Sequence, residues 1–104
     1  MKTLFFVLAF ISVTNCFSQT SQKYFSEGNI MLEKQNYKGA IENYSKAIEF
    51  DPKFAKAYIN RGVAKVSLGD NRGAIEDFTK AIGLKPKSIA DAYNNRGNAK
   101  ASHL

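Results

Sequence analysis

Cysteine and histidine are scarce in this chain, and tryptophan is absent. Its 104 residues contain one cysteine, Cys16, and one histidine, His103. A lone cysteine cannot form an intramolecular disulfide, so packing must hold the fold together. The sequence also lacks a carboxylate pair, a nucleophile–base pair, a glycine-rich phosphate loop and a metal-ligand cluster at mechanistic spacing. We therefore expect no enzyme activity, no catalytic residue, no bound cofactor and no metal.

The one continuous apolar run is short, from Leu4 to Ile11. A membrane-spanning helix needs about 20 apolar residues, so we expect no membrane span. Lys2 precedes the run, and small and polar residues follow it, which is the layout of a secretory signal peptide. We expect cleavage after Ser18, with residues 1–18 as the signal peptide and residues 19–104 as the domain of a secreted or periplasmic protein. The alternative is an uncleaved, buried N-terminal helix.

Cys16 allows a second interpretation of this segment, a lipoprotein signal in which the cysteine is acylated and becomes the first residue. Asn15 precedes it, where that processing prefers a small residue such as Gly, Ala or Ser. The sequence therefore favours a cysteine that is discarded with the signal peptide over a lipid anchor at Cys16. The mature chain would then contain no cysteine, which suits an oxidising compartment.

The formal net charge is +6, but the chain contains no run of five or six like charges. Basic and acidic residues are interspersed, which favours a solvated helical surface over a nucleic-acid-binding patch. We expect no nucleic-acid partner. Weak attraction to acidic partners or anionic membrane surfaces stays open.

The clearest feature is an internal repeat of 34 residues. Ser21–Phe54 aligns with Ala55–Ser88 without a gap and with eleven identities, and a third copy follows over residues 90–104. A fixed period of this length indicates a solenoid in which each unit buries its apolar face against its neighbours.

Each copy has the pattern of two helices joined by a turn. In the first copy we expect helices near Ser21–Lys34 and Lys38–Phe50; in the second, Gly69 and Pro86 end the two helices. The third copy contributes one helix, either a capping helix or the first half of a further unit. Gly28 and Gly62 fall mid-helix at equivalent positions, which predicts close helix–helix contact. The sequence thus predicts an all-α, right-handed solenoid of about two and a half units.

The repeat resembles the tetratricopeptide repeat family, whose signature is W-x2-L-G-x2-Y, then A-x3-F, then P. The second copy reads Tyr58-x2-Arg61-Gly62, then Ala74-x3-Phe78-x2-Ala81-x4-Pro86, and the first copy follows the same scheme from Tyr24 to Pro52. Tyr replaces the family's Trp, and Glu or Arg replaces its Leu. The resemblance covers residues 21–104 and, with the signal peptide, is to a bacterial secreted type.

In that family the first helix of each unit lines a concave groove that commonly holds a peptide. The resemblance therefore implies a non-enzymatic scaffold that binds a peptide or protein segment. The periodicity gives this groove partial support, because three apolar residues lie off the expected core stripe: Phe25, Ile59 and Val63. The implied groove residues are Phe25, Asn29, Lys56, Ile59, Asn60, Val63, Asn94 and Asn98.

Some members of the family grip the C-terminal carboxylate of heat-shock chaperones with a clamp of Lys, Asn, Asn, Lys and Arg. Asn29 and Asn60 match the two asparagines. The three cations are replaced by Phe25, Asp91 and Asn95. Without cations such a clamp cannot hold a carboxylate by charge-assisted hydrogen bonds, so we do not expect one here. The alternative to peptide binding is architectural: the chain self-associates as a homo-oligomer, or is a fragment of a longer repeat protein.

Overall fold

The computed structural model describes residues 2–84 and 96, with side chains from Phe17 onward. It contains four helices: α1 (Lys2–Glu33), α2 (Tyr37–Phe50), α3 (Ala55–Ser67) and α4 (Asn71–Gly83). No strand occurs among the described residues, which confirms the all-α prediction. The predicted third-copy helix, including Asn94 and Asn98, lies outside them, except for residue 96, which is helical.

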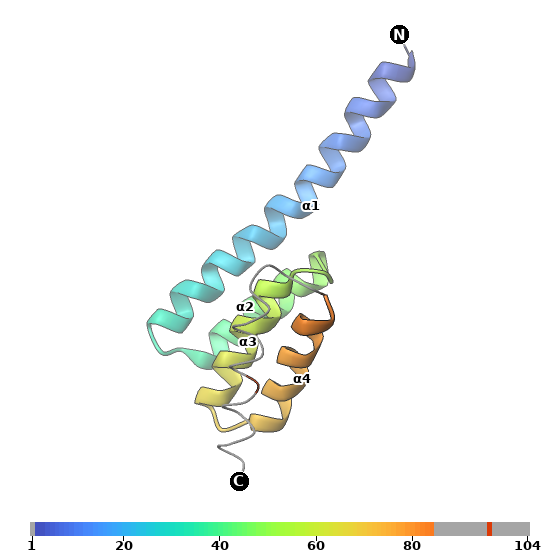
Figure 1. The fold of residues 1–104 in the computed structure, drawn as a ribbon. Helices are drawn as coiled ribbons and strands as arrows, with labels where there is room; N and C mark the ends of the chain where they lie inside the picture. Colours follow the sequence, from blue (N-terminus) through green and yellow to red (C-terminus); the bar gives the residue numbers. More distant parts are fainter. Residues whose placement is uncertain (1, 85–95, 97–104) are drawn as a thin grey trace.

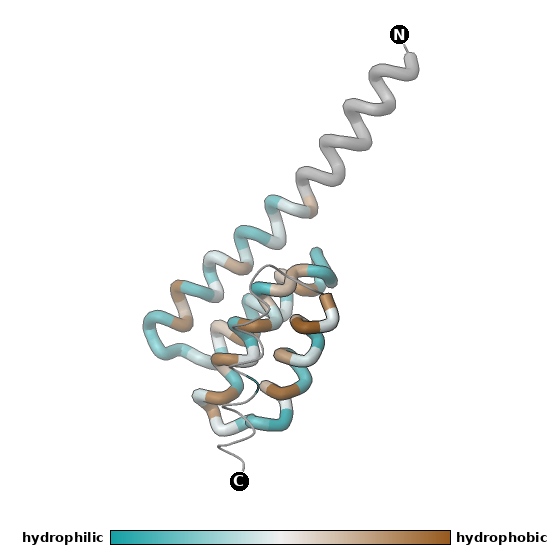
Figure 2. The backbone as a smooth tube through the Cα atoms, in the orientation of Figure 1, coloured by the Kyte–Doolittle hydropathy of each residue, from teal (hydrophilic) through white to brown (hydrophobic). Residues whose placement is uncertain are grey.

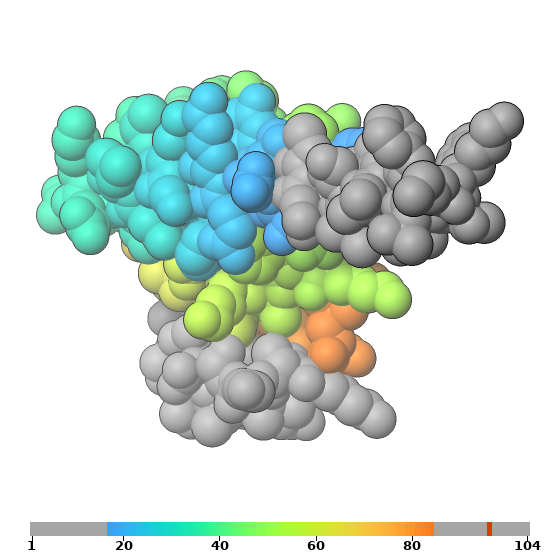
Figure 3. Space-filling view, turned by 90° about the horizontal axis from the view of Figure 1, so that it is seen from above, coloured from blue at the N-terminus to red at the C-terminus, as the bar shows by residue number. Residues whose placement is uncertain are grey.

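The helices pack in chain order. α1 packs on α2, α2 on α3, and α3 on α4, with a smaller contact between α1 and α3 (Figure 1). Seen from above, α1 lies over the green and yellow residues of α3, with the orange α4 beyond (Figure 3). The two helix pairs therefore stack, as the repeat predicts.

α1 begins much earlier than expected, at Lys2 rather than near Ser21. The sequence before Gly28 contains no glycine or proline to break a helix, so the helical geometry continues through the apolar run and past Ser18. The N-terminal part of α1 extends beyond the other three helices in Figure 1.

The turns repeat as the helices do. Asn36 caps α2 by accepting a hydrogen bond from the Gly39 N–H at 3.1 Å, and Asp70 caps α4 by accepting one from the Gly73 N–H at 3.0 Å. These caps satisfy a backbone donor that a helix start leaves unpaired. They fix the point at which each second helix begins.

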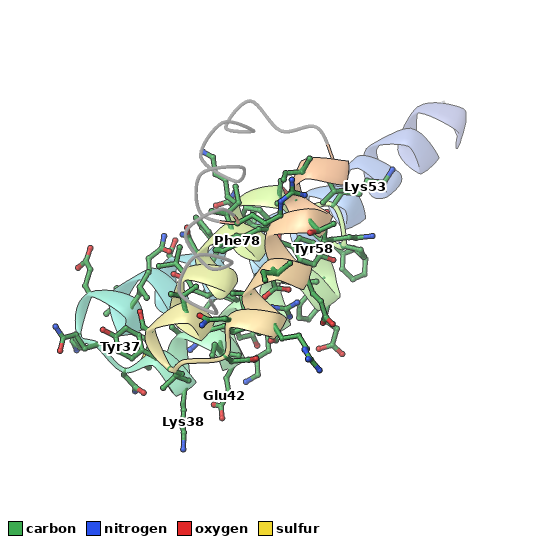
Figure 4. The ribbon with its side chains drawn as sticks, turned by 60° about the horizontal axis from the view of Figure 1, so that its bottom comes forward. Tyr37, Lys38, Glu42, Lys53, Tyr58 and Phe78 are labelled. Carbon is green, nitrogen blue, oxygen red and sulfur yellow. The ribbon has the colours of Figure 1, made fainter. Side chains whose placement is uncertain are left out.

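The apolar core divides into two clusters. The first contains Ala40, Tyr44 and Ala64, and the second is built around Tyr58 and Phe78. Because Ala64 belongs to α3, the second helix pair completes the core of the first. Figure 2 shows apolar and hydrophilic residues alternating along α2 to α4, as amphipathic helices require. In Figure 4, Phe78 lies among the helices, whereas Lys38 and Glu42 extend from α2.

Both mid-helix glycines lie against an aromatic ring. A Cβ on Gly28 would be 2.6 Å from Tyr44 Cε1, and one on Gly62 would be 2.5 Å from Phe78 Cε1. These distances are shorter than any van der Waals contact. The predicted close approach of the helices at both glycines is confirmed.

One expectation about the core is wrong. Ile59 does not lie off the core stripe: its side chain is 7% exposed and belongs to the second cluster, while Phe25 and Val63 pack against the clusters and are half-buried. The reason is that α3 contacts α1, α2 and α4, so more than one of its faces is covered. Periodicity along a single stripe underestimates the buried surface of such a helix.

Candidate functional site

Two asparagines meet where α1 and α3 run side by side. Asn60 Nδ2, on α3, donates a hydrogen bond to Asn29 Oδ1, on α1, at 2.9 Å. The Tyr44 hydroxyl, on α2, donates to the same oxygen at 2.6 Å. Three helices from both repeats therefore fix the orientation of one amide group.

The donor and acceptor groups that these two hydrogen bonds leave over define what the amide pair can offer to a ligand. Two donors already occupy Asn29 Oδ1. No hydrogen bond links Asn29 Nδ2 or Asn60 Oδ1 to another protein group in the part of the chain that the structure describes. Both side chains are half-buried. A carboxamide nitrogen has two N–H groups and a carboxamide oxygen accepts two bonds, so the pair offers one donor group and one acceptor group side by side.

Tyr44 keeps its proton at physiological pH. Its side chain is fully buried, and burial raises the pKa of the hydroxyl to about 12, with a further rise from the charge of Glu33; a hydrogen bond with Asn60 lowers it in part. The hydroxyl is therefore a permanent donor to Asn29.

Two phenylalanines lie next to the amide pair. The Phe25 ring, one turn before Asn29, is 4.8 Å from the Phe54 ring and 5.9 Å from the Tyr44 ring, measured between centroids. Phe54 is the N-cap residue of α3, and both phenylalanines are half-buried. We call Phe25, Asn29, Phe54 and Asn60 the α1–α3 seam.

The structure brings together three of the eight predicted groove residues, Phe25, Asn29 and Asn60. Lys56 is exposed in the first turn of α3, and Ile59 presents little surface because it is in the core. Phe54 was absent from the prediction because it lies between two helices, where periodicity carries no signal. Its aromatic side chain, at a repeat position where the second copy has Ser88, is the one sequence feature that distinguishes it.

A separate polar network joins α3 to α4. Arg61 Nε and Nη2 donate to the two carboxylate oxygens of Asp77 at 2.9 and 2.7 Å, and Lys65 Nζ lies 3.0 Å from Asp77 Oδ2. Arg61 Nη1 also donates to Ser45 Oγ on α2 at 3.1 Å. The hydrogen bond with Asp77 raises the pKa of the Arg61 guanidinium. The carboxylate is 5% exposed and both cations are 19% exposed, so this ionic triad is structural.

A cavity of about 250 Å³ lies at the C-terminal end of α2, lined by Phe17, Ser18, Phe50 and Asp51. The centroids of the Phe17 and Phe50 rings are 6.3 Å apart, and the Tyr24 ring stacks on Phe50 with its centroid at 5.8 Å. Small-molecule pockets are usually larger, about 300–1,000 Å³. We assign no ligand to this cavity.

The described part of the chain contains neither a candidate metal site nor a candidate membrane span. Residues 2–84 and 96 hold no group of three or more His, Cys, Asp or Glu side chains placed to bind a metal ion. Among the same residues, no helix combines the length and the apolar character that crossing a membrane demands.

Comparison with known proteins decides the family. A family model described as TPR repeat matches residues 28–69, and another described as tetratricopeptide repeat matches residues 55–88. Residues 28–88 are tetratricopeptide repeats. The predicted family and helical solenoid are thereby confirmed.

Similar proteins carry the same repeats. The chain is 44% identical over 43 residues to human small glutamine-rich tetratricopeptide repeat-containing protein beta; the match covers 41% of this chain but only 14% of that protein. It is 34% identical over 58 residues to a UDP-N-acetylglucosamine–peptide N-acetylglucosaminyltransferase of Giardia intestinalis, covering 56% of this chain and 4% of the enzyme. These matches are therefore to short repeat segments.

A solved structure of higher coverage is the second tetratricopeptide repeat domain of Spaghetti (RPAP3), bound to the HSP90 peptide SRMEEVD. It superposes with a TM-score of 0.81 at 28% identity, over 86% of this chain and 82% of that one. The likeness extends over most of the neighbour, so the two proteins share the tetratricopeptide fold.

Proposed function

We propose that this tetratricopeptide chain is a scaffold that binds an extended segment of another protein along the α1–α3 seam. The similar Spaghetti domain is bound to a peptide, which supports peptide binding as the mode of action. The observation that carries the proposal is the pair of hydrogen bonds by which Tyr44 and Asn60 fix the orientation of the Asn29 amide.

The amide pair suits a peptide because each peptide group has one donor and one acceptor. Asn29 Nδ2 would donate to a main-chain carbonyl, and Asn60 Oδ1 would accept from a main-chain N–H. Each neutral hydrogen bond contributes about 0.5–1.5 kcal/mol. Because Asn29 is already held in place, a ligand would not have to order it on binding.

Peptide capture with a matched pair of variants tests this proposal. We expect Asn60→Ala to weaken binding of captured peptides about tenfold, while circular dichroism shows an unchanged fold. Asn71→Ala, at the start of α4 and away from the seam, is the control and should bind as wild type does. Equal capture by Asn60→Ala and wild type would contradict the proposal.

We also propose that residues 1–18 are a leader removed on export, which would make this a bacterial secreted or periplasmic tetratricopeptide protein. The short apolar run after Lys2 supports this. Expression in a secreting bacterium followed by intact-mass measurement should give a chain that begins at Gln19. A mature mass that still includes residues 1–18 would refute this, and acylation at Cys16 would appear as added mass.

The remaining expectations stay predictions. Self-association is to be checked by light scattering. The absence of catalysis is an expectation from the residue content of the chain.

A further inference from the structure

We infer that the α1–α3 seam selects an uncharged segment with an aromatic or aliphatic side chain, and not an acidic C-terminus. The inference rests on the proposed function and specifies the ligand class of the same site. It follows from the spacing of the seam residues and from the charges around them.

The seam has two levels, one turn of α1 apart. Phe25 and Phe54 form the apolar level, and Asn29 and Asn60 form the amide level. A helical turn advances about 5.4 Å. An extended chain advances about 3.3 Å per residue, so side chains on one face recur every ~6.6 Å. An extended ligand can therefore place an apolar side chain on the phenylalanines while an adjacent peptide group meets the asparagines.

The residues of the seam carry no charge. Phe25, Asn29, Phe54 and Asn60 are neutral, and Tyr44 beneath them keeps its proton. A carboxylate bound at the amide level would lose water and gain neutral N–H donors only. The seam therefore has no means of compensating a negative charge.

The charged residues flanking the seam oppose one another. Glu33 lies one turn after Asn29 on α1, close enough for its charge to act on Tyr44. Lys56 lies one turn before Asn60 on α3. Both charged side chains are exposed, so solvent screens the repulsion from Glu33 and the attraction of Lys56 alike. An acidic ligand would therefore gain no net attraction from the two flanks.

The bound peptide of the Spaghetti domain illustrates the contrast. SRMEEVD contains three acidic side chains near its C-terminus. In this chain Phe25 packs against two other aromatic rings, Tyr44 and Phe54, at a position where a carboxylate-binding clamp has a lysine. At this position the chain therefore favours apolar contact over charge.

An array of seven-residue peptides, acetylated and amidated, tests the inference. The central residue is Phe, Leu, Ala or Asp, and Ser and Gln fill the other positions; SRMEEVD is included as free acid and as amide. We expect full-length protein to bind the Phe and Leu peptides at least tenfold more tightly than the Asp peptide. The two forms of SRMEEVD should give equal, weak signals.

Two variants identify the apolar level. Phe54→Ser introduces the residue that the second repeat has at this position, Ser88, and should reduce the preference for Phe and Leu over Ala at least fivefold. Phe50→Ser, an exposed phenylalanine outside the seam, is the control and should leave that preference unchanged.

The outcomes separate the two claims. Tightest binding of the acidic peptides, or loss of all binding in Lys56→Gln, would overturn this inference and leave peptide binding standing. No binding of any array peptide by wild-type protein would overturn the proposed function, and this inference with it.

Discussion

At the residue scale, the mid-helix glycines determine how closely the helices approach. Gly28 and Gly62 each face an aromatic ring at a distance that leaves no room for a methyl group. We expect Gly28→Ala and Gly62→Ala each to destabilise the protein by about 1–3 kcal/mol, because overpacking displaces the ring. Urea unfolding measures the change.

Gly83 is the matched control for these substitutions. Among the described residues, and apart from its chain neighbours and the backbone of its own helix, no atom lies within 4 Å of the position its Cβ would take. Gly83→Ala should leave stability unchanged or raise it by up to about 1 kcal/mol, through helix propensity alone. A similar loss in all three variants would contradict the packing argument.

Gln35 is strained where its counterpart is not. Its φ is +60°, whereas the equivalent residue of the second repeat, Gly69, has φ +84°. Left-handed geometry costs a residue with a side chain roughly 1–2 kcal/mol. We expect Gln35→Gly to raise stability by about 0.5–1 kcal/mol and Gly69→Ala to lower it, both by urea unfolding. A loss of stability in Gln35→Gly would show that the Gln35 side chain makes a compensating contribution.

Tyr44 makes the free energy of unfolding depend on pH in the alkaline range. Its pKa is about 12 in the folded protein and near 10 in the unfolded chain, so its contribution is complete below pH 10 and is lost as pH rises toward 12. A difference of about two pKa units corresponds to about 2–3 kcal/mol. Between pH 10 and pH 12 the wild type should therefore lose about that much more stability than Tyr44→Phe, which lacks this hydroxyl and keeps all other titratable groups. Parallel curves for the two proteins would refute the assignment.

At the element scale, the two helix pairs are closed by different interactions. α3 and α4 are joined by the ionic triad of Arg61, Lys65 and Asp77. The equivalent residues of the first pair are Glu27, Met31 and Asn43, which cannot form such a triad. Both copies therefore form the same helical hairpin, but different side chains join its two helices.

Removing the shared carboxylate should expose this difference. We expect Asp77→Asn to destabilise the protein by about 2–4 kcal/mol, because two partly buried cations lose their counter-charge. Glu76→Gln, on the adjacent exposed residue, should change stability by less than about 0.5 kcal/mol. Thermal and urea unfolding measure both, and equal effects would argue against a structural triad.

The sequence predicted elements better than the contacts between them. Gly69 marked the turn between the two helices of the second copy because the backbone preference of glycine acts locally. Phe54 and the triad were missed because their contacts depend on which helix lies opposite. The periodicity of apolar residues within one helix does not contain that information. Ile59 was misplaced for the same reason, since α3 is covered by several neighbours.

At the scale of the whole molecule, the two repeats share their core. Ala64 of α3 completes the first cluster, and Asn60 and Arg61 form hydrogen bonds to α1 and α2. In stacked repeats, such interfaces couple the stability of neighbours. We expect Gly62→Ala to accelerate amide hydrogen exchange in α2 as well as in α3 and α4. Acceleration confined to α3 and α4 would indicate independently stable units.

Ser21 gives the first turn of the domain a further consequence. Its buried hydroxyl donates to the Ser18 carbonyl at 2.9 Å, directly before the proposed cleavage point. Proteolysis there would remove residues 1–18 and place a new ammonium group at the positive end of the helix dipole, which is unfavourable. The freed Ser21 oxygen could then cap the Tyr24 N–H. Export would thus give the folded domain a helix N-terminus, capped by Ser21, that the newly synthesised polypeptide does not have.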